Sequence, residues 1–137
     1  MKIILVRHGE TDWNLKHIMQ GITDIPLNEK GKKQALMVSK KLENTKIDVC
    51  FSSPLKRAVQ TLNIITKVSP IIDNRLIERG MGELEGKNHK YYDVKLYWNY
   101  KINSNLYGVE SIRSLFKRVT DFFYEIKDKY YNSTVLI

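Results

Sequence analysis

A histidine between an arginine and a glycine follows the first apolar segment of this chain. The triplet Arg7-His8-Gly9 comes directly after the run 2–6. Gly9 allows the backbone to turn sharply beside a ligand, and an arginine binds phosphate or carboxylate through two parallel hydrogen bonds. A nearby cation also disfavours a protonated imidazole and so keeps His8 neutral and nucleophilic. These residue types suit nucleophilic attack on a bound anion, although a turn without a catalytic role is the simpler interpretation of the triplet alone.

A second arginine supports the anion hypothesis. Arg57 lies in the first turn of a helix that is predicted to begin at Ser53-Pro54, a serine N-cap followed by proline at the first helical position. Free N–H groups and the positive end of the helix dipole favour an anion at such a position. Arg57 would complete a phosphate site with Arg7 and His8, whereas a solvated helix residue without a partner is the alternative.

Three glutamates are candidates for a proton donor. Phosphoryl transfer to a histidine leaves an alkoxide, which needs a proton, and a carboxylic acid beside the phosphate can supply it. The segment 75–86 contains Glu78, Glu83 and Glu85. The residue types do not choose among the three, and simple solvation in a polar loop is the alternative for each.

The elements that must position these residues alternate between strands and helices. Strands are expected at 2–6, 47–51, 70–72 and 135–137, and helices at 28–42, 53–67 and 111–130. The first strand is predicted to be buried, and Asn28 is predicted to cap the first helix. Segment 8–27 is expected to be mostly loop, and 73–110 has no clear assignment. This order predicts an α/β fold with a largely parallel sheet and helices on both faces. Ligands of such folds bind at the carboxyl ends of the strands, where His8 and Arg57 are expected.

The composition is that of one globular domain over residues 1–137. With 42% hydrophobic and 28% charged residues, the chain is too apolar for a disordered tail and too polar for a membrane protein. The apolar run 3–6 is too short for a membrane helix or a signal peptide, so we expect a cytoplasmic protein without membrane contact. The single cysteine, Cys50, excludes an intrachain disulfide and is expected to be a small buried hydrophobe.

The net charge of +8 suggests an anionic partner without identifying it. The lysines are scattered over faces that are predicted to be solvated, which disfavours a nucleic-acid partner. The tyrosine-rich segment 91–100 is the single candidate for base stacking. We expect its aromatic residues to pack instead as a substrate lid or in the core.

The segment 7–14, RHGETDWN, resembles the signature of the histidine phosphatase superfamily, which includes the cofactor-dependent phosphoglycerate mutases. Other segments resemble further motifs of that family in the same order along the chain: 20–27, 28–35, 52–61, 76–86 and 108–118. Several motifs in the family order are far more specific than an isolated RHG. The resemblance implies a phosphoglycerate mutase-like fold with three α/β/α layers.

The resemblance also implies roles for particular residues. His8 would be the nucleophile and become a phosphohistidine, while Arg7 and Arg57 would bind the phosphoryl oxygens. Glu78 would protonate the leaving oxygen and later activate water, which makes Glu83 and Glu85 loop residues. The other residues expected to line the pocket are Asn14, Gln20 and Gly21. No metal and no other cofactor is expected, and the partner would be a phosphorylated small molecule.

The chain departs from the family pattern at its end. Family members carry a second active-site histidine just after a late β-branched strand, which here corresponds to 134–137. We do not expect either of the other histidines, His17 and His89, to replace it. The sequence therefore predicts a domain that is incomplete at its C-terminus and lacks a final strand and helix. Such a domain would expose apolar surface, which favours a homodimer.

These observations predict a phosphomonoester hydrolase that acts through a phosphohistidine on His8. The loop 82–86 resembles the phosphatase branch of the family, including the α-ribazole phosphatases of cobalamin synthesis. One alternative is a phosphate-binding remnant with impaired catalysis, because loss of one donor from an anion pocket costs roughly 10²- to 10³-fold in rate. The other is a phosphoglycerate mutase, although the mutases carry an additional segment between the glutamate and the second histidine.

Overall fold

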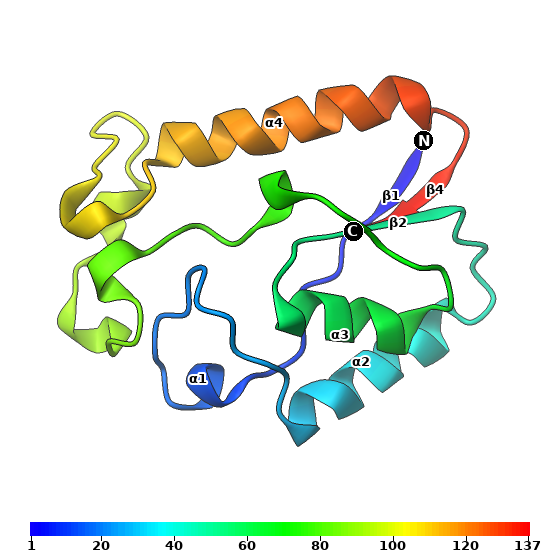
Figure 1. Cartoon of the computed structure of the whole chain (residues 1–137), viewed down its shortest axis with the longest axis horizontal. Coiled ribbons are helices and arrows are strands. Elements are labelled where there is room, and N and C mark those ends of the chain that lie inside the picture. Colours follow the sequence, from blue (N-terminus) through cyan, green and yellow to red (C-terminus); the bar gives the residue numbers. More distant parts are fainter.

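The computed structural model describes residues 1–137, apart from the side chain of Val94. A four-stranded parallel sheet forms its centre, in the order β1-β4-β2-β3 (Figure 1). The strands are β1 (Lys2–Ile4), β2 (Val49–Ser52), β3 (Ile71–Ile72) and β4 (Thr134–Leu136). The helices are α1 (Asp12–Leu15), α2 (Glu29–Leu42), α3 (Lys56–Ile65) and α4 (Ile112–Lys129). Short 3-10 helices lie between β3 and α4: η1 (Asn74–Leu76), η2 (Gly82–Leu84), η3 (His89–Tyr91), η4 (Val94–Trp98) and η5 (Leu106–Gly108).

The two central strands separate the helices into two layers. Successive side chains of a strand point to opposite faces of a sheet. Val49 and Phe51 of β2 accordingly pack in one cluster with Phe122 of α4, while Cys50 packs in another with Leu62 of α3. The predicted parallel α/β fold with helices on both faces is therefore confirmed (Figure 1).

Two helices begin or run as their local sequence predicts. Asn28 caps α2, and its side-chain oxygen accepts a hydrogen bond from the Gly31 N–H. Ser111 caps α4 in the same way through the Ser114 N–H. Residues spaced along one stripe of α4 are buried, and Phe122 in its centre is fully buried beneath the sheet. The apolar spacing along α4 thus predicted which face packs against the strands.

The first strand differs from the prediction of a buried strand. β1 ends at Ile4, and its residues are exposed or half-buried. Within the described residues β1 pairs with β4 on one side, which leaves it at an edge of the sheet. Leu5, just beyond it, is 69% exposed. A continuous apolar run predicts a strand but cannot show whether the strand has one neighbour or two.

The start of α3 also differs from the prediction. The helix begins at Lys56 rather than at Ser53-Pro54, and no side chain next to it in sequence provides a cap. Instead the carboxylate of Asp24 accepts the Lys56 N–H at 2.7 Å from a distant loop. This tertiary cap replaces the expected serine cap and leaves Ser53 in the turn that leads from β2 to the helix.

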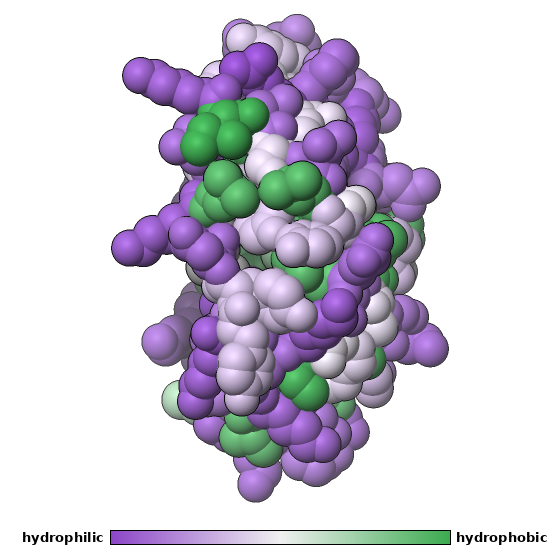
Figure 2. Space-filling view, turned by 90° about the vertical axis from the view of Figure 1, so that its left-hand side faces the viewer, coloured by the Kyte–Doolittle hydropathy of each residue, from purple (hydrophilic) through white to green (hydrophobic). Residues whose placement is uncertain are grey.

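The unassigned segment 73–110 folds around its own small core. Leu84, Tyr97 and Val109 are buried together there. Other aromatic residues of this segment are exposed, including Tyr91 and Trp98. Figure 2 shows this end of the molecule, where apolar residues are interspersed with hydrophilic ones. The part of the chain that the structure describes contains no helix long and apolar enough to cross a bilayer.

Candidate active site

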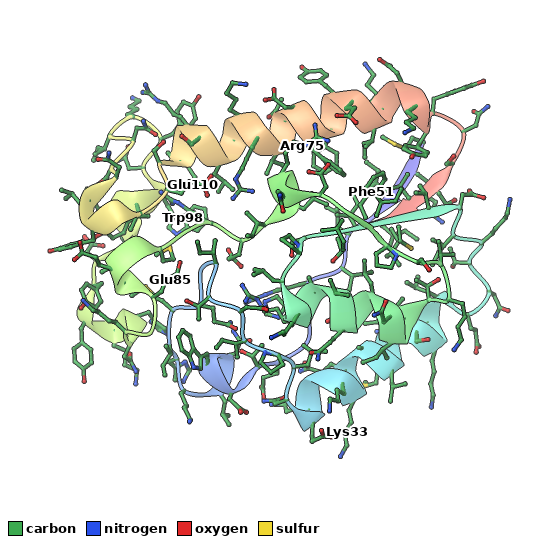
Figure 3. All side chains as sticks on the ribbon, in the orientation of Figure 1. Lys33, Phe51, Arg75, Glu85, Trp98 and Glu110 are labelled. Atoms are coloured by element: carbon green, nitrogen blue, oxygen red, sulfur yellow. The ribbon has the colours of Figure 1, made fainter. Side chains whose placement is uncertain are left out.

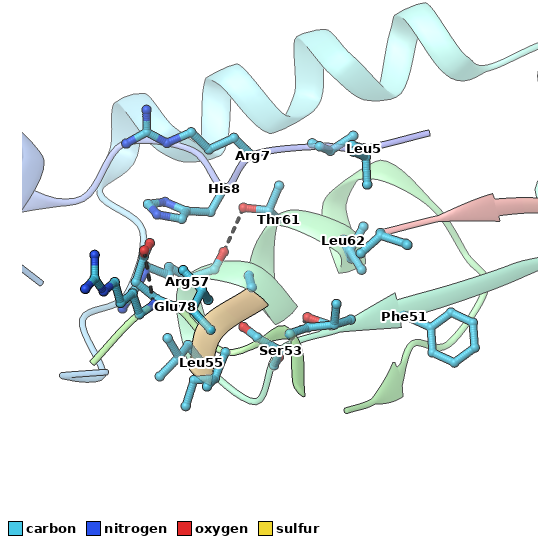
Figure 4. A pocket seen from close by; sticks show the side chains of 18 residues that line it. Leu5, Arg7, His8, Phe51, Ser53, Leu55, Arg57, Thr61, Leu62 and Glu78 are labelled. Atoms are coloured by element: carbon cyan, nitrogen blue, oxygen red, sulfur yellow. Dashed lines mark hydrogen bonds between the residues drawn. The ribbon is translucent and has the colours of Figure 1, made fainter. Parts of the chain in front are cut away.

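A cavity of about 560 Å³ opens where β1 and β2 end. Its wall includes Arg7 and His8 after β1, Ser53 after β2, Arg57 of α3 and Glu78 of the loop after η1 (Figure 4). Segments that lie far apart in the sequence therefore meet at the carboxyl edge of the sheet, as parallel topology requires. The structure brings together both arginines, the histidine and one of the three candidate glutamates.

The imidazole of His8 is oriented by the neighbouring backbone. Its Nδ1 lies 2.7 Å from the Gly9 carbonyl oxygen. A carbonyl oxygen can only accept, so Nδ1 carries the hydrogen and the lone pair of a neutral ring is on Nε2. Burial lowers the pKa of His8, and the charges of Arg57 and Arg7 lower it further. The sequence predicts this effect from Arg7, whereas in the structure burial is the larger cause.

Arg57 is fixed in the cavity wall, with some of its N–H groups still available. The side chain is 1% exposed. Its Nη1 donates to the Thr23 carbonyl at 2.8 Å and its Nη2 to the Gly21 carbonyl at 2.7 Å. A guanidinium has five N–H groups, so three remain for another acceptor. Burial lowers the pKa of Arg57, although the guanidinium keeps its proton because its ordinary value is so high.

Thr61 links the histidine loop to the arginine helix, a role that was not predicted from the sequence. Its hydroxyl accepts the Gly9 N–H at 3.2 Å and donates to the Arg57 carbonyl at 2.7 Å (Figure 4). Gly9 also packs against α2, because a Cβ there would lie 2.3 Å from the Gly31 carbonyl oxygen. These contacts fix the turn that carries His8.

Glu78 lines the same cavity as His8, and Figure 4 shows its carboxylate beside the imidazole. A salt bridge between Arg118 and Glu110 helps to hold the loop that carries Glu78. Arg118 of α4 donates to both carboxylate oxygens of Glu110, at 2.7 and 2.8 Å. Arg118 also donates to the Arg75 carbonyl at 2.6 Å, and Glu110 pairs with the backbone of Gly80. The loop that carries Glu78 is therefore tied down on both sides.

The other two candidate glutamates, Glu83 and Glu85, differ in exposure and in hydrogen bonding. Glu83 is exposed, and no hydrogen bond to it is found among the described residues. Glu85, labelled in Figure 3, accepts hydrogen bonds from Ile22, Thr23 and Met81. Sequence reasoning treated the two alike as loop residues, because nothing in a polar loop signals which acidic side chain turns inward.

The remaining predicted site residues lie at different depths. Asn14 lines a smaller hollow of about 230 Å³ beside His8, together with Arg7 and Gln34. Gln20 is buried, and its side-chain oxygen accepts from the Thr11 hydroxyl at 2.8 Å. Gly21 does not line the cavity; its carbonyl oxygen accepts a hydrogen bond from Arg57, which does. Gln20 and Gly21 are thus connected to the pocket through other residues.

The other two histidines lie together away from His8. The rings of His17 and His89 meet edge to face with centroids 5.5 Å apart, and neither lines the cavity at His8. No group of three or more potential metal ligands occurs among the residues that the structure describes.

Comparison with known proteins gives a consistent picture. The family model described as "Histidine phosphatase superfamily (branch 1)" matches residues 3–137. Phosphoserine phosphatase 1 of Hydrogenobacter thermophilus is 34% identical over 146 residues, a match that covers 100% of this chain and 69% of that protein. The solved structure titled Bacillus stearothermophilus YhfR superposes with a TM-score of 0.83 at 33% identity, covering 98% of this chain and 71% of the other. A phosphoglycerate mutase from Thermus thermophilus superposes with a TM-score of 0.82 at 32% identity, covering 99% and 76%.

Proposed function

We propose that this chain, which belongs to branch 1 of the histidine phosphatase superfamily, hydrolyses phosphate monoesters through a phosphohistidine on His8. The observation that carries the proposal is the orientation of His8, whose Nδ1 is engaged by the Gly9 carbonyl and whose Nε2 is thereby a free nucleophile. It lines one cavity together with Arg7, Arg57 and Glu78. This combination suits phosphoryl transfer.

The proposed reaction has two steps. In the first, Nε2 of His8 forms a bond to phosphorus while the bond to the leaving oxygen breaks, and Glu78 gives its proton to that oxygen. In the second, Glu78 takes a proton from water, the water oxygen bonds to phosphorus, and the phosphorus–nitrogen bond breaks. Arg7 and Arg57 bind the phosphoryl oxygens in both steps, where negative charge accumulates in the transition state.

The relatives favour a small phosphorylated substrate. One relative is named a phosphoserine phosphatase and another a phosphoglycerate mutase, and both names refer to a phosphate ester of a small carboxylic acid. A substrate of this class fits a cavity of about 560 Å³ whose polar wall is formed by arginine, histidine and glutamate. The choice between hydrolase and mutase rests on whether water or a second hydroxyl takes the phosphoryl group from His8.

Hydrolysis of p-nitrophenyl phosphate tests the proposal. Wild type should release nitrophenol, and His8→Ala should not, whereas His17→Ala serves as a matched control on an exposed histidine and should keep the wild-type rate. Brief reaction with a ³²P-labelled substrate should leave an acid-labile label on wild type that His8→Ala lacks. A folded wild-type chain that binds inorganic phosphate without turnover would instead support the alternative of a phosphate-binding remnant. Interconversion of 2- and 3-phosphoglycerate faster than hydrolysis would support a mutase.

A further inference from the structure

Glu85 accepts four hydrogen bonds from two different loops. Its Oε1 accepts the Ile22 N–H at 3.0 Å and the Met81 N–H at 2.9 Å. Its Oε2 accepts the Thr23 N–H at 2.9 Å and the Thr23 hydroxyl. All four partners donate to the carboxylate, which favours its ionised form. Burial alone would raise the pKa of Glu85, but these hydrogen bonds outweigh it and lower the value.

The loop held by Glu85 is also the loop that holds Arg57. The peptide group between Gly21 and Ile22 donates its N–H to Glu85 and accepts the Arg57 Nη2 on its carbonyl oxygen. Thr23 contacts both side chains as well: its N–H donates to Glu85, and its carbonyl oxygen, which belongs to the next peptide group, accepts from Nη1 of Arg57. A peptide group that is polarised on one side by an anion becomes a stronger partner for a cation on the other side. Glu85 and Arg57 are therefore coupled electrostatically through the peptide group between Gly21 and Ile22.

The backbone between them leaves no room for a side chain at position 21. Gly21 has a φ of +52°, which favours glycine. A Cβ at this position would lie 2.1 Å from Oε1 of Glu85 and 2.9 Å from the Met81 nitrogen. The close approach of Glu85 thus requires a glycine at the position whose carbonyl receives Arg57.

We propose that Glu85 is a positioning residue for Arg57, which it holds in the phosphate-binding orientation through the backbone of Gly21 and Thr23. The inference rests on the proposed function, because it assigns Arg57 to phosphate. Glu85 itself does not contact the phosphoryl group. Its removal leaves the loop 21–23 without its anchor and lets the guanidinium turn away from the pocket.

Binding of inorganic phosphate, measured by calorimetry, tests this role without any need for turnover. Glu85→Gln keeps the size of the side chain but replaces an oxygen acceptor by a donor that faces N–H groups, and it should weaken phosphate binding by roughly 10-fold. The matched control is Glu83→Gln, two residues earlier and exposed, which should stay within about 2-fold of wild type. In an Arg57→Lys background the Glu85→Gln change should add less than about 2-fold, because both act through the same guanidinium.

A second variant and an NMR measurement test the same role independently of how Glu85→Gln folds. Thr23→Val removes one of the four hydrogen bonds and should shift phosphate binding in the same direction by a smaller factor if Glu85→Gln does not fold. Exchange of the Arg57 guanidinium hydrogens with water, followed by ¹⁵N NMR without ligand, should be faster in Glu85→Gln or Thr23→Val than in Glu83→Gln. The role of Glu85 is contradicted if the losses from Glu85→Gln and Arg57→Lys multiply, or if Arg57 exchange is unchanged. Absence of turnover in a wild type whose Arg57 exchange depends on Glu85 would contradict the proposed function alone.

Discussion

The hydroxyl of Thr61 gives a sharp test of how the nucleophile loop is held. It accepts the N–H of Gly9, the residue whose carbonyl orients His8, and donates to the carbonyl of Arg57. Thr61 is 3% exposed, so no water replaces a lost contact from the bulk. The substitution Thr61→Val removes the hydroxyl while nearly preserving the size of the side chain.

The expected loss follows from the contacts. Without the hydroxyl the buried Gly9 N–H has no partner, which costs about 1–3 kcal/mol. The nitrogen–oxygen distance of 3.2 Å lies at the long end of the normal range, so we expect a loss of about 1.5 kcal/mol for Thr61→Val. For a chain of this length this corresponds to a fall in Tm of about 6 °C. Misplacement of the His8 turn should also lower kcat by about 10-fold.

Thr61→Ser is the matched control, because it keeps the hydroxyl and loses only a methyl group. It should cost about 1 kcal/mol of stability through the lost packing but retain kcat. Urea denaturation and aryl phosphate hydrolysis on the three proteins separate the two effects. The reasoning is refuted if Thr61→Val is as stable and active as wild type, or if Thr61→Ser loses more activity than Thr61→Val.

Three further predictions concern His8, the Arg118–Glu110 pair and the cap of α3. Burial, and after it the charge of Arg57, lowers the pKa of His8, so on acidification the imidazole is protonated in the unfolded chain before it is protonated in the folded one. Wild type should therefore lose stability relative to His8→Gln as the pH falls through the ordinary histidine value of about 6.5. A stability difference between the two proteins that is the same at all pH values would contradict this. Arg118→Met leaves the half-buried Glu110 carboxylate without its salt-bridge partner, which should lower the free energy of unfolding by about 2 kcal/mol and also lower kcat. The double variant with Glu110→Gln should recover part of the loss, and additive losses would argue against the pair. Asp24→Ala removes the cap of α3 and should cost about 1 kcal/mol in chemical denaturation, whereas Asp24→Asn should retain most of it; equal losses in both variants would show that the cap is unimportant.

The parts of the fold with a local signal were predicted from the sequence. The α2 helix, its Asn28 cap and the buried stripe of α4 all depend on residues within a few positions of one another. The alternation of strands and helices then restricted the sheet to a parallel arrangement, which placed His8 and Arg57 at one edge. The motif resemblance singled out Glu78 among three glutamates, and this is the glutamate that lines the cavity.

The sequence by itself thus determined the layers of this protein, the edge of the sheet where its chemistry is concentrated, and the residue types available there. Only the tertiary structure decided that β1 lies at an edge of the sheet formed by the described residues, that Asp24 caps α3 across 32 positions and that Glu85 rather than Glu83 turns inward. The physical reason is that apolar periodicity and local caps act over a few residues and leave a pattern in the sequence. A hydrogen bond between two loops leaves none, because the same polar residue serves equally well in water until the folded chain brings its partner within about 3 Å.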